Sequence, residues 1–147
     1  MLTRECAGGV VFIDNSVFLL KNHKAEWVLP KGVIRKNTQL ALDVALERVK
    51  IEGGVEADVI SPAGETSYEF FSYSRKIPVC NKIDWFIMQA KSDSFTINKE
   101  QGFTDGGFFQ IDEALEKITY SQDKSLVRLA YRKYNFYRNQ ELAETVG

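Results

Sequence analysis

The stretch from Trp27 to Val55 constrains the fold of this 147-residue chain most strongly. It starts as an apolar run and leaves that run through Pro30 into a loop. Apolar residues then recur at three- and four-residue steps, which makes one face of a helix: Leu42, Ala45, Leu46 and Val49. Asn37 or Thr38 can cap the start of this helix, and Gly53-Gly54 can end it, because glycine adopts the left-handed conformation without strain. The stretch therefore predicts strand, loop and helix, with the helix packed through Leu42, Leu46 and Val49.

Shorter patterns on either side add further strands and two more helices. Apolar runs bounded by turn residues predict strands at residues 6–13, 17–20, 55–60, 65–73, 82–88 and 107–111. Helical patterns cover residues 112–117 and about 121–142. The apolar side of the last helix is predicted to hold Leu126, Leu129, Ala130, Tyr134 and Tyr137. Because hairpins alternate with helices, we expect an α/β (α+β mixed) fold with a mixed sheet between helices, in a single domain over residues 1–147.

Composition narrows the function classes. The formal net charge is −1, so no bulk attraction to nucleic acid or to an anionic membrane is implied, although a local basic patch remains open. Two cysteines, Cys6 and Cys80, are too few for a disulfide framework, and residues 1–5 lack the apolar stretch of a signal peptide. The apolar runs are too short to cross a membrane. We therefore expect a cytoplasmic protein whose cysteines are small core residues.

The segment from Leu29-Pro30-Lys31-Gly32 to Gly54-Val55 resembles the box of the Nudix hydrolases. That box reads Gly, five residues, Glu, seven residues, Arg-Glu-apolar, one residue, Glu-Glu, one residue, Gly-apolar. Residues 7–11, 82–88 and 108–123 are also similar to family segments, the last two to those of diadenosine tetraphosphate hydrolases and diphosphoinositol phosphohydrolases. The resemblance implies an α/β/α sandwich with a mixed, partly antiparallel sheet. It also implies Mg²⁺-dependent cleavage of a nucleoside diphosphate linked to another group.

The box in this chain is one residue too long, so two registers are open. Counted back from Gly54, the family's loop glutamate, Arg-Glu pair and Glu-Glu pair fall on Gln39, Glu47-Arg48 and Ile51-Glu52. Counted forward from Gly32, the loop glutamate, the arginine, the first helix glutamate and the later pair fall on Thr38, Leu46, Glu47 and Lys50-Ile51. Each register keeps one glutamate of four. We favour the backward register, because it keeps Gly54 on its glycine and puts the additional residue in the loop, where insertions cost little.

Metal-binding chemistry is the part of the resemblance that this sequence supports least. Mg²⁺ takes oxygen ligands, and the family supplies them from glutamates on one helix face. Glu47 and Glu52 are five residues apart and point about 140° apart on a helix, so they cannot grip one ion from the same side. Arg48 places a cation where the first ligand belongs, and it can pair with Glu52 at i,i+4. Asp43 shares a face with Glu47 and offers the only alternative dyad, which is more simply a solvated acidic face.

Phosphate-binding features are better preserved. Lys31 and Gly32 precede the helix, whose N-terminus attracts anions, and Arg35 adds a cation to the loop. The resemblance implies that Lys82 is a phosphate-contacting strand lysine. Several aromatic residues could stack a base: Tyr68, Phe70, Phe71, Tyr73 and Trp85. Of these, Tyr68 is the candidate for the ligand site.

Three functional hypotheses follow. In the first, the chain binds a nucleotide or another phosphorylated small molecule with little or no hydrolysis. In the second, it is an active Mg²⁺-dependent hydrolase of the diadenosine tetraphosphate type, with Glu47, Glu52 and Asp105 as catalytic residues and Glu52 as metal ligand; Glu100 is the second choice for the acid at Asp105. In the third, it is a protein-interaction domain whose aromatic and basic last helix contacts a partner.

Overall fold

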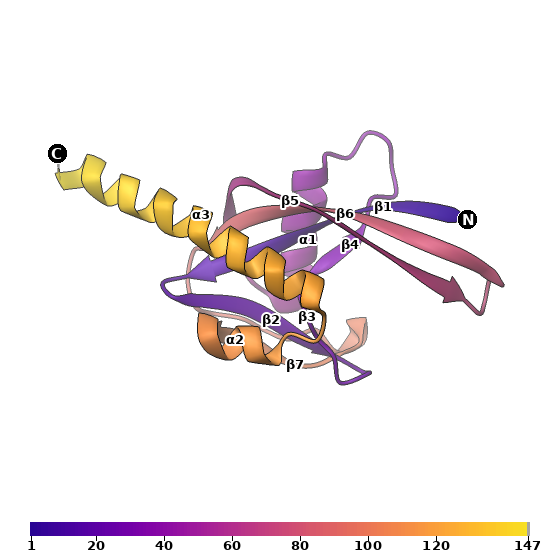
Figure 1. The fold of residues 1–147 in the computed structure, drawn as a ribbon. Coiled ribbons are helices and arrows are strands. Elements are labelled where there is room, and N and C mark those ends of the chain that lie inside the picture. Colours follow the sequence, from indigo (N-terminus) through magenta and orange to yellow (C-terminus); the bar gives the residue numbers. More distant parts are fainter. Residues whose placement is uncertain (147) are drawn as a thin grey trace.

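A mixed seven-stranded sheet forms the centre of the molecule, which a computed structural model describes over residues 1–146 (Figure 1). The strands are β1 (Leu2–Ile13), β2 (Ser16–Asn22), β3 (Trp27–Val28), β4 (Lys31–Val33), β5 (Ala57–Ser72), β6 (Ile77–Ala90) and β7 (Phe103–Gln110). Their order is β3-β2-β1-β6-β5, with β4 also pairing with β1 and β7 with β2. Strands β1 and β6 run parallel, and the other pairs are antiparallel. The predicted mixed sheet is confirmed.

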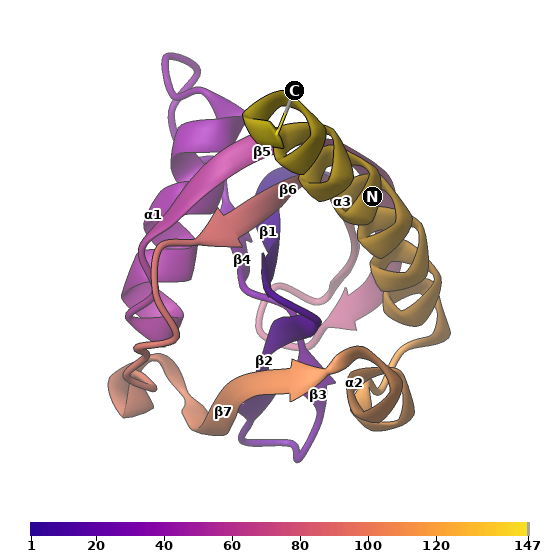
Figure 2. The same cartoon turned by 90° about the vertical axis from the view of Figure 1, so that its left-hand side faces the viewer.

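Helices cover both faces of this sheet. Helix α1 (Ala41–Gly53) lies on one face, while α2 (Ile111–Lys117) and α3 (Ser121–Val146) lie on the other (Figure 2). Side chains of β1 alternate between the two layers, as a pleated strand requires. Ala7 and Val11 belong to the apolar cluster under α1, whereas Val10 and Phe12 belong to the cluster under α2 and α3. The arrangement confirms the predicted α/β/α sandwich.

The start of α1 differs from the prediction. Neither Asn37 nor Thr38 caps the helix; Leu40 occupies the N-cap position and makes no capping hydrogen bond. Gln39 makes the side-chain hydrogen bonds of this loop instead. Its Oε1 accepts from the backbone N–H groups of Arg35 and Lys36, both at 3.3 Å. The loop is therefore closed on itself by Gln39, and the helix begins after it.

The packing face of α1 includes Leu46 and Val49, as predicted, but not Leu42. Leu42 is 37% exposed, so the expectation that it packs on the sheet was wrong, while Val44 and Val49 are buried. At the other end the prediction is confirmed: Gly54 takes the left-handed conformation, with φ of 63°, and its N–H donates to the Lys50 carbonyl. The helix starts later than predicted, at Ala41, so Leu42 lies in its first turn, which faces solvent.

Three further boundaries were not predicted. Lys31 and Gly32 lie in the short strand β4 instead of a loop. The two expected strands at 55–60 and 65–73 are parts of one long strand, β5, whose pairing with β6 shifts register twice, around Ser61 and Gly64. In α3 the side chain of Leu129 is 55% exposed, and Val127 takes the predicted buried place.

The β5–β6 hairpin and the last turns of α3 project from opposite ends of the sandwich (Figure 1). Both cysteines are free and buried, as predicted for core residues. Within residues 1–146, no helix is both long and apolar enough to cross a membrane.

Candidate functional site

The box helix presses an arginine against the strand that precedes the loop. A Cβ atom added to Gly32 would lie 2.5 Å from Cδ of Arg48 and 2.6 Å from its Nε, so a larger residue here would force the Arg48 side chain to move. The guanidinium then pairs with Glu52 one turn later, with 2.6 Å between Nη2 and Oε2 and 3.1 Å between Nε and Oε2. The i,i+4 pair predicted from the sequence is therefore present.

Glu52 is the buried member of this pair. Its side chain is 4% exposed, while that of Arg48 is 27% exposed. Burial raises the pKa of the Glu52 carboxyl, and four contributions oppose that rise: the hydrogen bond from Arg48, the charge of Arg48, the charge of Lys31 and a backbone hydrogen bond from Lys31. Because a carboxylate out of water is costly unless it is paired, Arg48 supplies the countercharge that keeps the ionised form tolerable.

A loop residue that the sequence did not indicate completes the surroundings of Arg48. The Arg48 Nη2 also donates to Oε1 of Gln101, at 3.2 Å, from the short 3₁₀ helix η1 (Lys99–Gln101). Asn98 anchors this segment to α1, because its side chain donates to the Ile51 carbonyl at 3.0 Å and its backbone N–H donates to the Glu52 carbonyl at 3.0 Å. The separation of about fifty residues left no signal in the sequence spacing.

The other two catalytic candidates lie apart from this pair. Glu47 is exposed on α1, and five residues of helix set its direction about 140° from that of the buried Glu52. Asp105 lies in β7 opposite Lys21, and its Oδ1 accepts from the next backbone N–H, that of Gly106, at 2.7 Å. The second-choice acid, Glu100, is exposed beside Gln101 in η1.

These donors do not fit a magnesium ion. Mg²⁺ needs several oxygen atoms in octahedral geometry, and the carboxylate of Glu52 is already engaged by a guanidinium. Ile51 contributes an apolar side chain, and the charge of Arg48 repels a divalent ion. Across residues 1–146, no three His, Cys, Asp or Glu side chains come close enough to form a metal site. In this segment the carboxylate of Glu52 is therefore engaged by a fixed organic cation.

Lys31 and Tyr68 come together on the opposite side of β4. Lys31 pairs with Gly8 across the sheet, and its Nζ lies 5.9 Å from the centre of the Tyr68 ring. Beside them, burial raises the pKa of Asp123 at the start of α3, and the positive charge of Lys31 opposes that rise. Glu26 is nearby as well, and hydrogen bonds from Tyr120 and Asn22 lower the pKa of its carboxyl.

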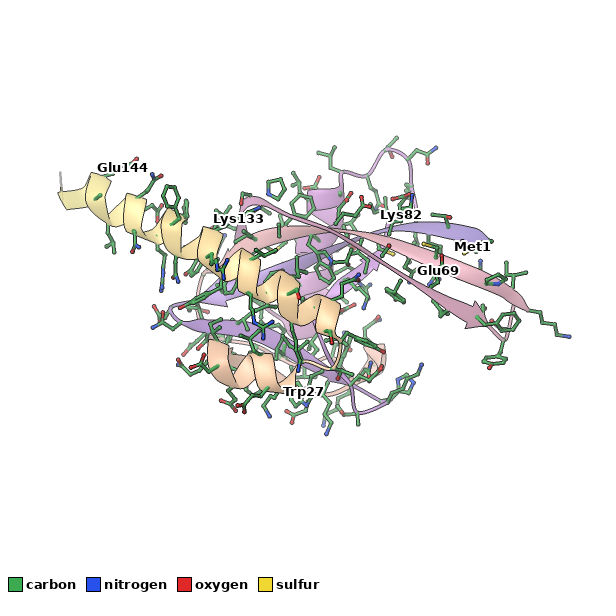
Figure 3. All side chains as sticks on the ribbon, viewed as in Figure 1. Met1, Trp27, Glu69, Lys82, Lys133 and Glu144 are labelled. Atoms are coloured by element: carbon green, nitrogen blue, oxygen red, sulfur yellow. The ribbon has the colours of Figure 1, made fainter. Side chains whose placement is uncertain are left out.

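The remaining ligand candidates are placed elsewhere. Lys82 alternates on β6 with Ile83, which packs under α3, so Lys82 lies on the α1 face of the sheet and away from Lys31 (Figure 3). Arg35 is exposed in the loop before α1, with its backbone N–H bound to Gln39. Of the predicted ligand residues, Lys31 and Tyr68 therefore share one site. Gly32 lies against the side chain of Arg48, and Lys82 lies on the other face of the sheet.

Two shallow hollows lie outside this region. One, of about 480 Å³, lies between β5 and α3 and is lined by Ile60, Ser61, Arg132, Lys133, Phe136, Tyr137 and Gln140. The other, of about 470 Å³, lies at the C-terminal end of α1 and is lined by Lys50, Ile51, Gly54, Thr96, Ile97, Asn98, Lys99 and Glu100. Neither includes Arg48, Lys31 or Tyr68. The second hollow does include Ile51 and Asn98, which lie beside the Arg48–Glu52 pair.

Solved structures with the same architecture include several hydrolases. An Ap4A hydrolase of C. elegans superposes with a TM-score of 0.68 at 14% sequence identity, covering 90% of this chain and 98% of the hydrolase. A NUDIX hydrolase from Nitrosomonas europaea gives 0.68 at 14% identity, over 89% and 90%. The E. coli dihydroneopterin triphosphate pyrophosphohydrolase gives 0.68 at 13% identity, over 86% and 95%. No protein-family model matches the sequence. The chain therefore has the Nudix fold, and the resemblance predicted from the box is confirmed at the level of the fold.

Proposed function

We propose that this Nudix-fold chain binds a nucleotide or nucleoside polyphosphate without a metal ion and with little or no hydrolysis. The observation that carries the proposal is the Arg48–Glu52 ion pair, at 2.6 Å, seated over Gly32. It neutralises the one box glutamate that the backward register retains. It also places a positive charge where, in the family, a glutamate that holds the metal ion would lie.

Loss of the metal affects hydrolysis far more than binding. Cleavage of a diphosphate linkage builds up negative charge, and a bound divalent ion contributes several kcal/mol to its stabilisation. Each 1.4 kcal/mol lost lowers the rate about tenfold. Arg48 is a single charge that is already shared with Glu52 and Gln101, and it does not activate a water molecule as a metal does. We therefore expect turnover to fall to near background.

Binding depends on different groups. Lys31 forms no ion pair among residues 1–146, and its ammonium already rests over the Tyr68 ring. A phosphate beside Lys31 and a base beside Tyr68 would use the same two side chains without any metal. The similar structures include hydrolases named for Ap4A and dihydroneopterin triphosphate, which supports a phosphorylated ligand with an aromatic ring system.

Two assays on one preparation test the proposal. In the first, calorimetry in EDTA should show binding of diadenosine tetraphosphate or ATP. Lys31→Gln should weaken that binding roughly tenfold, since a charge-assisted hydrogen bond contributes about 1.5–3 kcal/mol. Lys133→Gln, on the exposed side of α3, is the matched control and should leave the affinity unchanged (Figure 3).

The second assay follows nucleotide consumption in excess Mg²⁺ by chromatography. The expected result is an intact nucleotide. Robust turnover that falls in Glu47→Gln or Glu52→Gln would establish the hydrolase instead. Absence of both turnover and binding across a nucleotide panel would favour the protein-interaction reading, for which the basic and aromatic hollow beside α3 is the available surface.

A further inference from the structure

One face of the projecting hairpin carries a row of linked polar and aromatic side chains. The register of the sheet sets Arg4 of β1 opposite Asn81 of β6, and Asn81 opposite Tyr68 of β5. The next row along the hairpin ends in Phe70, whose ring stacks on that of Tyr68 with 5.8 Å between centres. Residues directly opposite in neighbouring strands share a face of a sheet. Together with Lys31, these four residues are called the hairpin face below.

A buried amide holds the row in place. Asn81 is 4% exposed, its Oδ1 accepts from Nε of Arg4 at 2.8 Å, and its Nδ2 donates to the Tyr68 hydroxyl at 2.7 Å. Asn81 thereby fixes the orientation of both partners before any ligand arrives. The terminal guanidinium nitrogens of Arg4 and the hydroxyl proton of Tyr68 remain available as donors.

Two cations flank the two rings. Arg4 lies over the Phe70 ring with 5.6 Å from Cζ to the centre, and Lys31 lies over Tyr68 at 5.9 Å. In the part of the chain that the structure describes, neither cation forms a salt bridge. The acidic residues of the hairpin strand, Glu65 and Glu69, alternate with Thr66, Tyr68 and Phe70 and so lie on the opposite face.

No helix covers this part of the sheet. The hairpin extends past the first turn of α3 on one side and past α1 on the other (Figure 1). Tyr68 is 41% exposed and Phe70 is 38% exposed, so the rings are open to a ligand. Aromatic side chains on a pleated surface normally pack against a neighbouring layer, and here that neighbour is missing among the residues described.

We propose that the hairpin face binds a short single-stranded oligonucleotide. Lys31 lies opposite Gly8, four residues from Arg4 on β1, so the two cations are anchored roughly 13 Å apart along the strand. A nucleoside polyphosphate carries its charges on adjacent phosphates, whereas a single strand carries one phosphate per nucleotide, with the bases projecting from the sugars between the phosphates. Two cations with two stacked rings between them fit two phosphates that are two nucleotides apart, whose bases lie on the rings. Stacked bases on aromatic rings beside cations are the usual means of binding single strands without sequence preference.

This inference extends the proposed function, because Lys31 and Tyr68 serve both ligands while Arg4 and Phe70 serve only the longer one. The formal net charge of −1 agrees with a local contact and not with bulk attraction. Two phosphate contacts predict a modest salt dependence, with log affinity falling with a slope of about −1.4 against log salt concentration.

Fluorescence anisotropy with a labelled RNA hexanucleotide of mixed sequence, and with its DNA equivalent, tests the proposal. Phe70→Ala and Arg4→Gln should each weaken binding about tenfold or more. The matched controls are Phe71→Ala, on the opposite face of the same strand, and Arg75→Gln, in the hairpin turn; both should bind as the unaltered chain does. Thermal unfolding of each variant shows that the fold is retained.

The outcomes separate this inference from the proposed function. Binding of RNA or DNA single strands that is lost in Arg4→Gln, while ATP binding is kept, supports it. Equal binding of a blunt duplex, or equal losses in Phe70→Ala and Phe71→Ala, would overturn it. Failure to bind either hexanucleotide at about 100 µM, the range of ordinary non-specific contacts, would also overturn it. The proposed function fails separately, if ATP and diadenosine tetraphosphate do not bind.

Discussion

At position 48 the chain carries a cation where the family box, read in the backward register, carries its first helix glutamate. The consequence is electrostatic. A buried carboxylate such as Glu52 must be paired, protonated or metal-bound to be tolerated. The guanidinium of Arg48 supplies the pairing internally, at 2.6 Å, so the folded chain does not need an ion to neutralise Glu52.

Removal of the Arg48 guanidinium should lower the free energy of unfolding by an amount that depends on pH. Arg48→Gln leaves Glu52 buried with one weaker partner, and we expect a loss of about 1–3 kcal/mol at neutral pH. Burial already raises the pKa of Glu52, and loss of Arg48 raises it further. A carboxyl whose pKa is higher in the folded state holds its proton there while the unfolded chain releases it, so stability falls as pH rises through that window.

Urea unfolding at two pH values measures the effect. The penalty of Arg48→Gln should be smallest at about pH 3, below the ordinary pKa of a glutamate, where Glu52 is protonated in the folded and the unfolded chain, and largest at about pH 7. Arg35→Gln, in the exposed loop, should stay within about 0.5 kcal/mol of the unaltered chain at both values. An equal penalty at both pH values would show that Glu52 is not the group that Arg48 serves.

Single residues were predictable where local spacing decides their contacts. The pairing of Arg48 with Glu52 follows from their separation of four on a helix. The contact of Arg48 with Gln101 does not, because it depends on how the segment after β6 wraps the end of α1. Lys31 and Lys82 were grouped as phosphate ligands, and only the sheet register shows that they point to opposite faces.

At the scale of elements, α1 begins without a capping side chain. Leu40 is 61% exposed at the N-cap position and makes no hydrogen bond to the first turn. The sequence suggested Asn37 or Thr38, because both residue types cap well, but the helix starts beyond them, at Ala41. A loop closed by the Gln39 side chain is a tertiary detail that residue preferences do not encode.

The missing cap offers a stabilising substitution. Leu40→Asp should raise the free energy of unfolding by about 1 kcal/mol, because its carboxylate can accept from the first-turn N–H groups and favours the helix dipole. Thermal denaturation should show the gain. Thr38→Asp, at the predicted but unused cap position, is the control and should leave stability unchanged. A gain in the control alone would place the helix start at the earlier residue.

Element existence was predicted well, and element extent less well. Each helix and most strands follow from their apolar patterns. Residues 57–72 form one strand, whereas the sequence predicted two, because Pro62 and Gly64 are typical of a turn between strands. In the structure they mark register shifts within a continuous strand, which is a common role for such residues in sheets.

At the scale of the whole molecule, the fold and the box chemistry are separable. The sandwich matches structures of hydrolases at 13–14% sequence identity, because burial of apolar side chains in two layers defines it. Neither apolar cluster contains a carboxylate of the box. Function resides in sites carried on a fold, so the shared fold by itself does not assign an activity to this chain.

Calorimetric titration of Mn²⁺ into two proteins tests the central claim, that Arg48 stands in for the metal. The unaltered chain should show no binding at millimolar Mn²⁺. The variant Gln39→Glu, Glu47→Arg, Arg48→Glu and Ile51→Glu restores the family's carboxylates in the backward register, and it should bind with a dissociation constant below about 1 mM. Submillimolar binding by the unaltered chain that disappears in Glu52→Gln would contradict the claim.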